Sequence, residues 1–142
     1  MRRPFEFAVV VVLVAVLAIL AMQALQRARG EVEEASVQAE AASMRAQLME
    51  RLAHRATFGG ALPASDNPVD WIRLAPNNYR GAHDRPPAER RIWYYDKARQ
   101  ELIYVFDDGH YARFRLSRTA GGSGVRGVMG GVGLLRVAEG GQ

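Results

Sequence analysis

Residues 2–22 read RRPFEFAVVVVLVAVLAILAM, and the interpretation of the whole chain depends on this stretch. The nineteen residues from Phe7 to Leu25 carry no charge, and Gln23 is the only polar one among them. An α-helix rises about 1.5 Å per residue, so the run spans about 28 Å, roughly the hydrocarbon core of a bilayer. Pro4 precedes it, where the first turn of a helix tolerates proline. We therefore predict a membrane-spanning helix here.

A cleaved signal peptide is the alternative interpretation of this stretch. The apolar part of a signal peptide is usually about 7–15 residues long, shorter than this run. The one small-x-small cleavage site, Ala28-Arg29-Gly30, lies beyond the run and contains an arginine, so we expect a retained anchor. Arginines flank the run on both sides, which nearly balances the positive-inside rule. The very short N-terminus, with Arg2 and Arg3, favours a cytoplasmic N-terminus.

Apolar residues continue at helical spacing beyond Gly30, in two neighbouring lines. The first line consists of Val32, Ala35, Ala39, Ala42, Ala46, Met49, Ala53 and Ala56, and the second of Val37, Ala41, Met44, Leu48 and Leu52. The positions between them are polar and are expected to face solvent. We predict one nearly continuous helix from about residue 5 to 56. Its second half packs either on its own domain alone or also on neighbouring copies, and we expect the Met44–Leu52 end to pack on the head while the earlier alanines stay available.

The rest of the chain predicts a small α+β head. Residues 58–68 form a Gly- and Pro-rich linker, and Asn67 and Pro68 open a short helix that we expect to run through Leu74. Residues 75–90 are expected to be a loop. Three segments rich in aromatic and β-branched residues, 91–96, 101–107 and 110–116, then predict an antiparallel meander.

Alternation within the meander predicts its two faces. Leu102, Tyr104 and Phe106 lie on one face of the middle strand, while Arg113 and Arg115 put the other face of the last strand in water. In the glycine-rich remainder only 133–137 has the composition of a strand, and we expect the rest to be flexible. The predicted organisation is thus a transmembrane helix (1–29), an amphipathic stalk helix (30–58), the head (59–118) and a flexible tail (119–142).

Composition and motifs argue against chemistry in this chain. It has 142 residues, a net charge of +4 and no cysteine, and its arginines are scattered rather than clustered, so no nucleic-acid partner is expected. His54, His83 and His110 lack metal-ligand spacing, and 107–109 has ordinary turn composition. Nucleophile, zinc and phosphate-loop motifs are missing. We expect no enzyme activity, no metal, no cofactor and no small-molecule substrate. The residues that we expect in the core are Trp71, Trp93, Tyr94, Tyr95 and Tyr104.

The arrangement of an apolar helix that becomes amphipathic, then a loop and an antiparallel sheet, resembles type IV pilins and type II secretion pseudopilins. NPVDWIRLAPNNYRG (67–81) and RIWYYDKARQELIYVF (91–106) look like the heads of their minor, pilin-like members. FEFAVVVV (5–12) is most similar to the F component of mannose-sensitive haemagglutinin (MSHA) pilus operons. This resemblance implies a minor structural or assembly component in the bacterial inner membrane, with its head in the periplasm. Its implied partners are the lipid bilayer, other pilin-like subunits and the assembly platform.

The resemblance also implies candidate contact residues. In the family, a glutamate near the start of the helix neutralises the terminal amine of a neighbouring subunit; Glu6 is the candidate here, unless it simply pairs with Arg2 or Arg3. The family's cleavage glycine is missing before Phe5, so we expect the chain to stay uncleaved. Ala35, Ala39 and Ala42 are the candidate subunit-contact positions on the stalk. A membrane-anchored periplasmic binding or regulatory module, unrelated to pilus assembly, is the alternative function.

Overall fold

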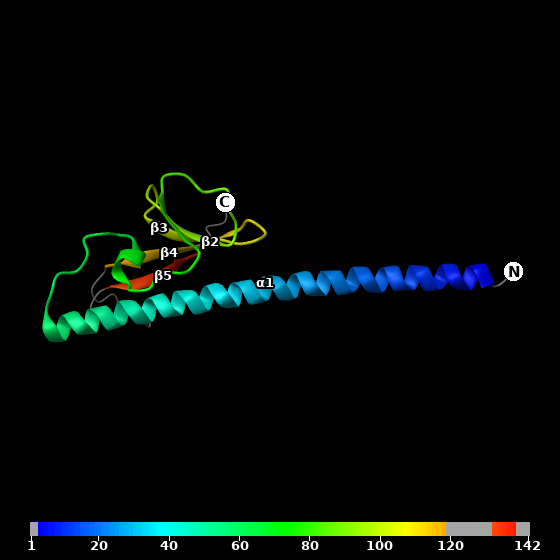
Figure 1. The fold of residues 1–142 in the computed structure, drawn as a ribbon, viewed down its shortest axis with the longest axis horizontal. Helices are drawn as coiled ribbons and strands as arrows, with labels where there is room; N and C mark the ends of the chain where they lie inside the picture. Colours follow the sequence, from blue (N-terminus) through cyan, green and yellow to red (C-terminus); the bar gives the residue numbers. More distant parts are fainter. Residues whose placement is uncertain (1–2, 119–131, 139–142) are drawn as a thin grey trace. The chain divides into compact units, whose positions relative to one another are not determined.

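The computed structural model describes residues 3–118 and 132–138 (Figure 1). In chain order its elements are helix α1 (Arg3–Phe58), a 3-10 helix η1 (Pro68–Trp71), and strands β1 (Tyr79–His83), β2 (Ile92–Asp96), β3 (Glu101–Val105), β4 (Tyr111–Ser117) and β5 (Gly133–Val137). The long helix and the sheet together make an α+β fold. The chain divides into two compact units, Met1–Ser36 and Val37–Gln142, and α1 contributes to both.

Helix α1 is continuous over 56 residues, which confirms the predicted extent of the helix. Its residues contain no proline after Pro4, and Gly30 is accommodated within it. The helix ends at the glycines of the predicted linker. Gly59 has a φ of 75° and donates its backbone N–H to the carbonyl of Arg55 at 2.8 Å. A glycine in the left-handed region is the usual way to end an α-helix, because it satisfies a terminal carbonyl without a Cβ clash.

The five strands form one sheet in the order β1-β2-β3-β4-β5. The predicted meander is confirmed, since β2 pairs antiparallel with β3, and β3 with β4. The prediction of a purely antiparallel head is wrong, because β1 pairs with β2 in parallel. Strand β1 lies inside the stretch 75–90 that was expected to be a loop. Its residues, YRGAH, do not alternate cleanly, and its register with β2 shifts between Tyr79 and Ala82, so the local pattern hid it.

Parallel neighbours need a connection that returns along the sheet. Here residues 84–91 make that return and pass over the side of the sheet away from α1 (Figure 1). On that side of β2 and β3 a second small cluster is buried, made of Ile92, Tyr94, Ile103 and Val105. The expectation that the outer face of β4 is wet holds at Arg115, which is exposed, whereas this cluster covers the outer face of β2 and β3.

Two further predictions in the head are corrected or confirmed by the structure. The short helix after Asn67 is capped as predicted, since the Asn67 side chain accepts a hydrogen bond from the Val69 N–H, but it is a single 3-10 turn that ends at Trp71 rather than continuing to Leu74. The segment with strand composition in the glycine-rich tail is strand β5, antiparallel to β4, so the tail is not flexible over 133–137. Residues 119–131 and 139–142, also predicted to be flexible, lie outside the described residues.

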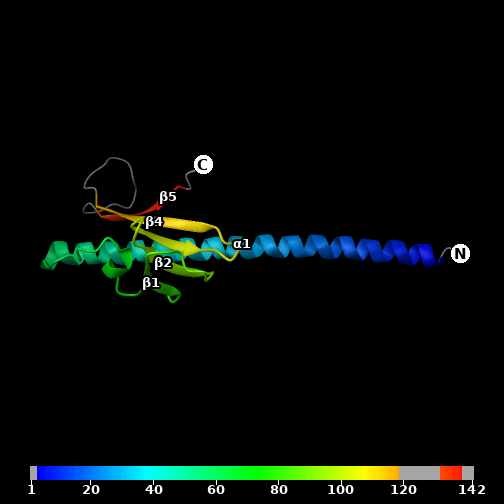
Figure 2. The same ribbon diagram turned by 90° about the horizontal axis from the view of Figure 1, so that it is seen from above.

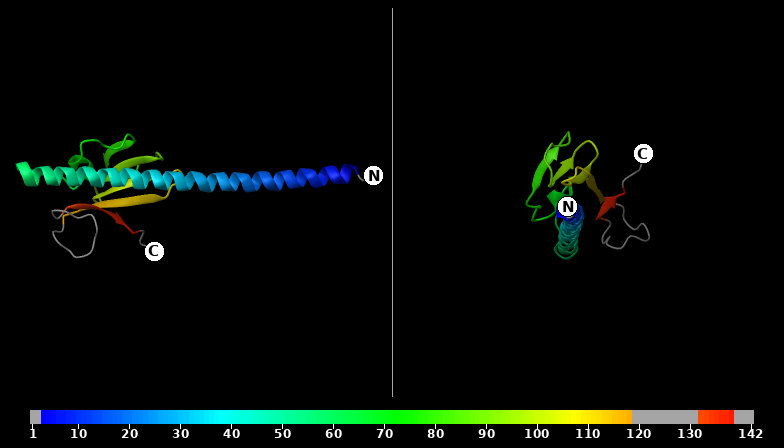
Figure 3. Two further views of the ribbon diagram at one scale, coloured as in Figure 1. Left: turned by 90° about the horizontal axis from the view of Figure 1, so that it is seen from below. Right: turned by 90° about the vertical axis from the view of Figure 1, so that its right-hand side faces the viewer.

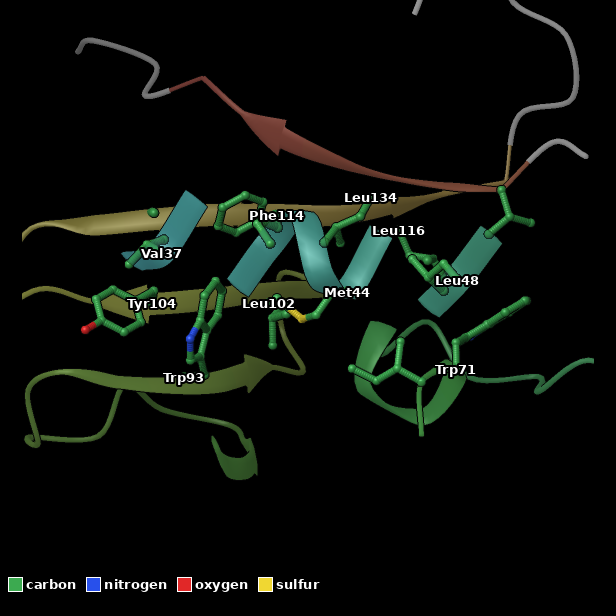
Figure 4. Packing of buried hydrophobic residues seen from close by; sticks show 14 of the residues in the cluster. Val37, Met44, Leu48, Trp71, Trp93, Leu102, Tyr104, Phe114, Leu116 and Leu134 are labelled. Atoms are coloured by element: carbon green, nitrogen blue, oxygen red, sulfur yellow. The ribbon is translucent and has the colours of Figure 1, made fainter. Parts of the chain in front are cut away.

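The main core lies between the sheet and the second half of α1. Residues 37–58 of α1 cross one face of the sheet, with β1 and β2 on one side of the helix and β4 and β5 on the other (Figures 2 and 3). The helix contributes Val37, Ala41, Met44 and Leu48, and the sheet contributes Trp93, Leu102, Tyr104, Phe114 and Leu134, among others (Figure 4). Trp71 of η1 closes the core beside Leu48.

Candidate functional site

The first unit of the chain presents an apolar helix surface. By length and composition, α1 is able to cross a membrane, and none of its most apolar stretch is buried within the chain. Phe5, Phe7 and the following valines and leucines are all exposed. In water such a surface would be costly to hydrate, whereas lipid matches it and the helix satisfies its own backbone hydrogen bonds. Glu6 lies in the first turn of this helix and is exposed.

The second half of α1 uses only one of its two apolar lines to hold the head. Val37, Ala41, Met44 and Leu48 are buried, and Leu52 packs at the edge of the same cluster. This confirms the expectation that the Met44–Leu52 end packs on the head, although the contact begins earlier, at Val37. Met44 and Leu48 belong to the same cluster as the large rings of the sheet. Alanine side chains in their place would leave cavities, so packing favours the line with the longer side chains at this contact.

Three polar side chains of α1 also bind the head, although their positions were predicted to face solvent. Glu40 accepts a hydrogen bond from the indole N–H of Trp93. Arg45 Nε donates to the carbonyl oxygen of Leu134 at 3.0 Å. The Gln47 side-chain oxygen accepts from the backbone N–H groups of Arg73 and Leu74, at 3.1 and 3.0 Å. Their partners lie 26 to 89 residues away in the chain, so helical periodicity carries no signal for them.

These contacts define the rotation of the helix against the sheet. They reach the segment after η1, strand β2 and strand β5, on both sides of the buried line. Hydrogen bonds that involve an ionised group contribute about 1.5–3 kcal/mol each, more than neutral ones. The face that is left outward is therefore held outward by specific bonds as well as by packing.

We call the outward line of α1 the alanine face. It consists of Val32, Ala35, Ala39, Ala42, Ala46, Met49, Ala53 and Ala56, of which all but the half-buried Met49 are exposed. The predicted contact residues Ala35, Ala39 and Ala42 lie on it, Ala35 in the first unit and the other two in the second. Within the first unit Glu6 lies far from Ala35, which is 29 positions further along the helix, about 44 Å away.

The alanine face is suited to close helix packing and to little else. Small side chains let two helix backbones approach closely, which favours association through van der Waals contact. The face itself carries no side chain that titrates or coordinates. The face therefore offers a partner helix a surface of small side chains for close packing.

The three histidines make local structural contacts. The His54 ring lies against Phe58, and His83 Nε2 is 3.0 Å from the carbonyl oxygen of Arg80. His110 stacks on Phe106, and its backbone N–H and its ring both hydrogen-bond the Asp108 carboxylate, which lowers the pKa of that carboxyl. Within residues 3–118 and 132–138, no group of three or more His, Cys, Asp or Glu is placed to hold a metal ion.

The other features singled out in the sequence have structural roles. Residues 107–109 form the predicted turn, in which Gly109 has a φ of 93° and its N–H donates to the carbonyl of Phe106 at 3.0 Å. The aromatic residues expected in the core are buried there: Trp71, Trp93, Tyr94, Tyr95 and Tyr104. Burial, helped by the nearby Asp96 carboxylate, raises the pKa of Tyr94 to about 12.

Comparison of the chain with family models, curated proteins and solved structures finds no match.

Proposed function

We propose that this protein is a minor, pilin-like structural or assembly component of a type IV (MSHA-type) pilus or a type II secretion system. It works without catalysis, through lateral packing of α1 against the helices of other pilin-like subunits. The proposal places the apolar part of α1 in the bacterial inner membrane, the N-terminus in the cytoplasm and the head in the periplasm.

The observation that carries the proposal is that one apolar line of α1 is buried against the head while the other is exposed. A helix that served only its own domain would need one apolar line, and Val37, Ala41, Met44 and Leu48 already supply it. The alanine face is a second apolar line at helical spacing, and it is exposed. Such a line suits a second helix at close range, and the membrane-length segment that precedes it would bring neighbouring copies side by side in the plane of the bilayer.

The same proposal gives Glu6 and the missing glycine their roles. A lone carboxylate at the edge of the lipid is costly unless it is paired. We assign Glu6 to pairing with a cationic group, either on a neighbouring subunit or on the adjacent arginines. The chain remains uncleaved, since no glycine precedes Phe5. Intact mass of membrane-extracted protein, with and without prepilin peptidase, tests this directly; loss of the first residues only when the peptidase is present would contradict it.

Co-purification with sheared pili, together with crosslinking to other pilin-like subunits, tests the packing role. Ala39→Leu and Ala42→Leu enlarge the alanine face without touching the core, so we expect normal folding and loss of most crosslinked product. Ala88→Leu is the matched control, because Ala88 is exposed on the crossover between β1 and β2. Unchanged crosslinking in both stalk variants would refute the packing role and favour the alternative of an anchored binding or regulatory module. For Glu6, unchanged crosslinking in Glu6→Ala would remove its role between subunits.

A further inference from the structure

Strand β4 extends beyond the end of its neighbour β5. Their register runs from Ser117↔Gly133 to Arg113↔Val137, so among the described residues Tyr111 and Ala112 have no strand partner on that side. On the other side both pair with β3. A groove of about 410 Å³ opens at this step; it is lined by His110, Tyr111, Ala112, Arg113, Arg136, Val137 and Ala138.

The charge in this groove is positive. Arg113 is half-buried, and its side chain makes no hydrogen bond or ion pair within the described residues. Arg115, two residues further along the same face of β4, is different, because its guanidinium donates to the buried carboxylate of Glu101 at 2.8 Å. The His110 ring is already engaged, because its Nδ1 hydrogen-bonds the Asp108 carboxylate. None of the lining residues that the structure describes carries a carboxylate.

The remaining walls suit a peptide. Tyr111 is 43% exposed and offers an aromatic ring, and Val137 and Ala138 are apolar. An open strand edge offers backbone N–H and C=O groups, which an added strand pairs with while pockets and charges along the edge select its side chains. A free phosphate or a nucleic acid would use the arginine and leave the strand edge and the apolar walls without a partner.

We infer that this groove binds an extended, acidic segment of a partner protein. The segment continues the line of β5, pairs its backbone with Tyr111 and Ala112, and places a carboxylate against the Arg113 guanidinium. A guanidinium binds a carboxylate through two parallel hydrogen bonds, which makes the contact directional as well as electrostatic. This inference does not depend on the assembly role of α1.

Fluorescence anisotropy with a labelled peptide, acetyl-Val-Glu-Val-Glu-Val-amide, tests the groove in the full-length protein held in detergent. Alternation puts both glutamates on one face of the extended peptide. We expect saturable binding that weakens about tenfold in Arg113→Gln, the size of one lost charge-assisted hydrogen bond. Arg73→Gln, which removes an exposed arginine outside the groove, is the matched control and leaves the affinity unchanged. Replacing both glutamates of the peptide by glutamine also weakens binding about tenfold.

A change to the peptide keeps the test decisive if Arg113→Gln does not fold. A peptide methylated on its central backbone nitrogen cannot pair as a strand, and we expect it to bind about tenfold more weakly to the unaltered protein. Equal binding of the methylated peptide, an equal loss in Arg73→Gln, or complete displacement by inorganic phosphate at the peptide's own concentration would each overturn the inference. So would a chain shortened after Ala138 that binds the peptide tenfold more tightly, since the occupant would then be this protein's own end.

Discussion

Replacing Met44 by alanine tests which line of α1 holds the head. The Met44 side chain is 1% exposed and lies beside Leu102 in the core (Figure 4). Truncating a buried methionine removes its transfer free energy and leaves a cavity, which together cost about 2–5 kcal/mol. The site lies between a helix and a sheet that are held by hydrogen bonds on both sides and cannot easily collapse. We therefore expect the free energy of unfolding to fall by about 3 kcal/mol.

Met49→Ala is the matched control, because it makes the same chemical change five residues along the same helix, on the half-buried edge of the alanine face. Methionine and alanine are both good helix formers, so helix propensity changes little in either variant. We expect less than about 1 kcal/mol for Met49→Ala, since little buried surface is lost.

Thermal unfolding of the full-length protein in detergent, followed by near-ultraviolet circular dichroism of the buried tryptophans, measures the difference. Unfolding entropy is about 2 cal/mol/K per residue. For the second unit, Val37–Gln142, which has roughly 100 residues, a loss of about 3 kcal/mol therefore corresponds to a fall in Tm of about 15 °C. The Tm of Met49→Ala should fall by less than about 5 °C. Equal shifts in the two variants, or a larger shift for Met49→Ala, would refute the assignment of the two lines.

Three further outcomes follow from individual contacts. Glu40→Ala leaves the buried indole N–H of Trp93 without its acceptor and should lower the free energy of unfolding by about 1–3 kcal/mol, whereas the exposed Glu50→Ala should leave it unchanged; equal effects would contradict the role of Glu40. Asn67→Ala removes both the cap on the Val69 N–H and the hydrogen bond to the Tyr79 hydroxyl and should cost about 1–2 kcal/mol in urea unfolding, against almost nothing for the exposed Asn77→Ala. Tyr94 has a pKa of about 12 in the folded chain and near 10.0 when unfolded, so between these pH values the unfolded state has already lost a proton that the folded state still holds, and stability should fall as pH rises. Tyr94→Phe should flatten that fall in a series of thermal melts, and an unchanged slope would rule out Tyr94 as its source.

The sequence alone was sufficient for the elements whose signal is local. The length of α1 follows from an unbroken helical pattern, and its end follows from two glycines. The meander follows from three segments of β-branched and aromatic residues separated by short turns. In each case the residues that set the structure are within a few positions of one another, so periodicity and turn composition report it.

Strands β1 and β5 depend on partners that are distant in the sequence, so only the tertiary structure shows how they pair. Strand β1 forms because β2 offers it a parallel edge, although its own residues lack alternation. Strand β5 pairs with β4, and the glycine-rich sequence between them did not indicate which strand β5 would join. Parallel pairing and edge addition depend on backbone groups far apart in the chain, which side-chain pattern does not record.

The alanine face of α1 was also predicted only in part from the sequence. Hydropathy marks both apolar lines of α1 and does not by itself say which one a sheet would cover. That choice depends on how side-chain volumes of Met44 and Leu48 fill the space beneath Trp93 and Phe114, and on polar contacts from Glu40 to Trp93 that span 53 residues. The sequence determined that a long apolar helix with a two-lined stalk precedes a small sheet. The tertiary structure determined which line faces outward, because volume and hydrogen-bond geometry are matched only when the distant segments meet.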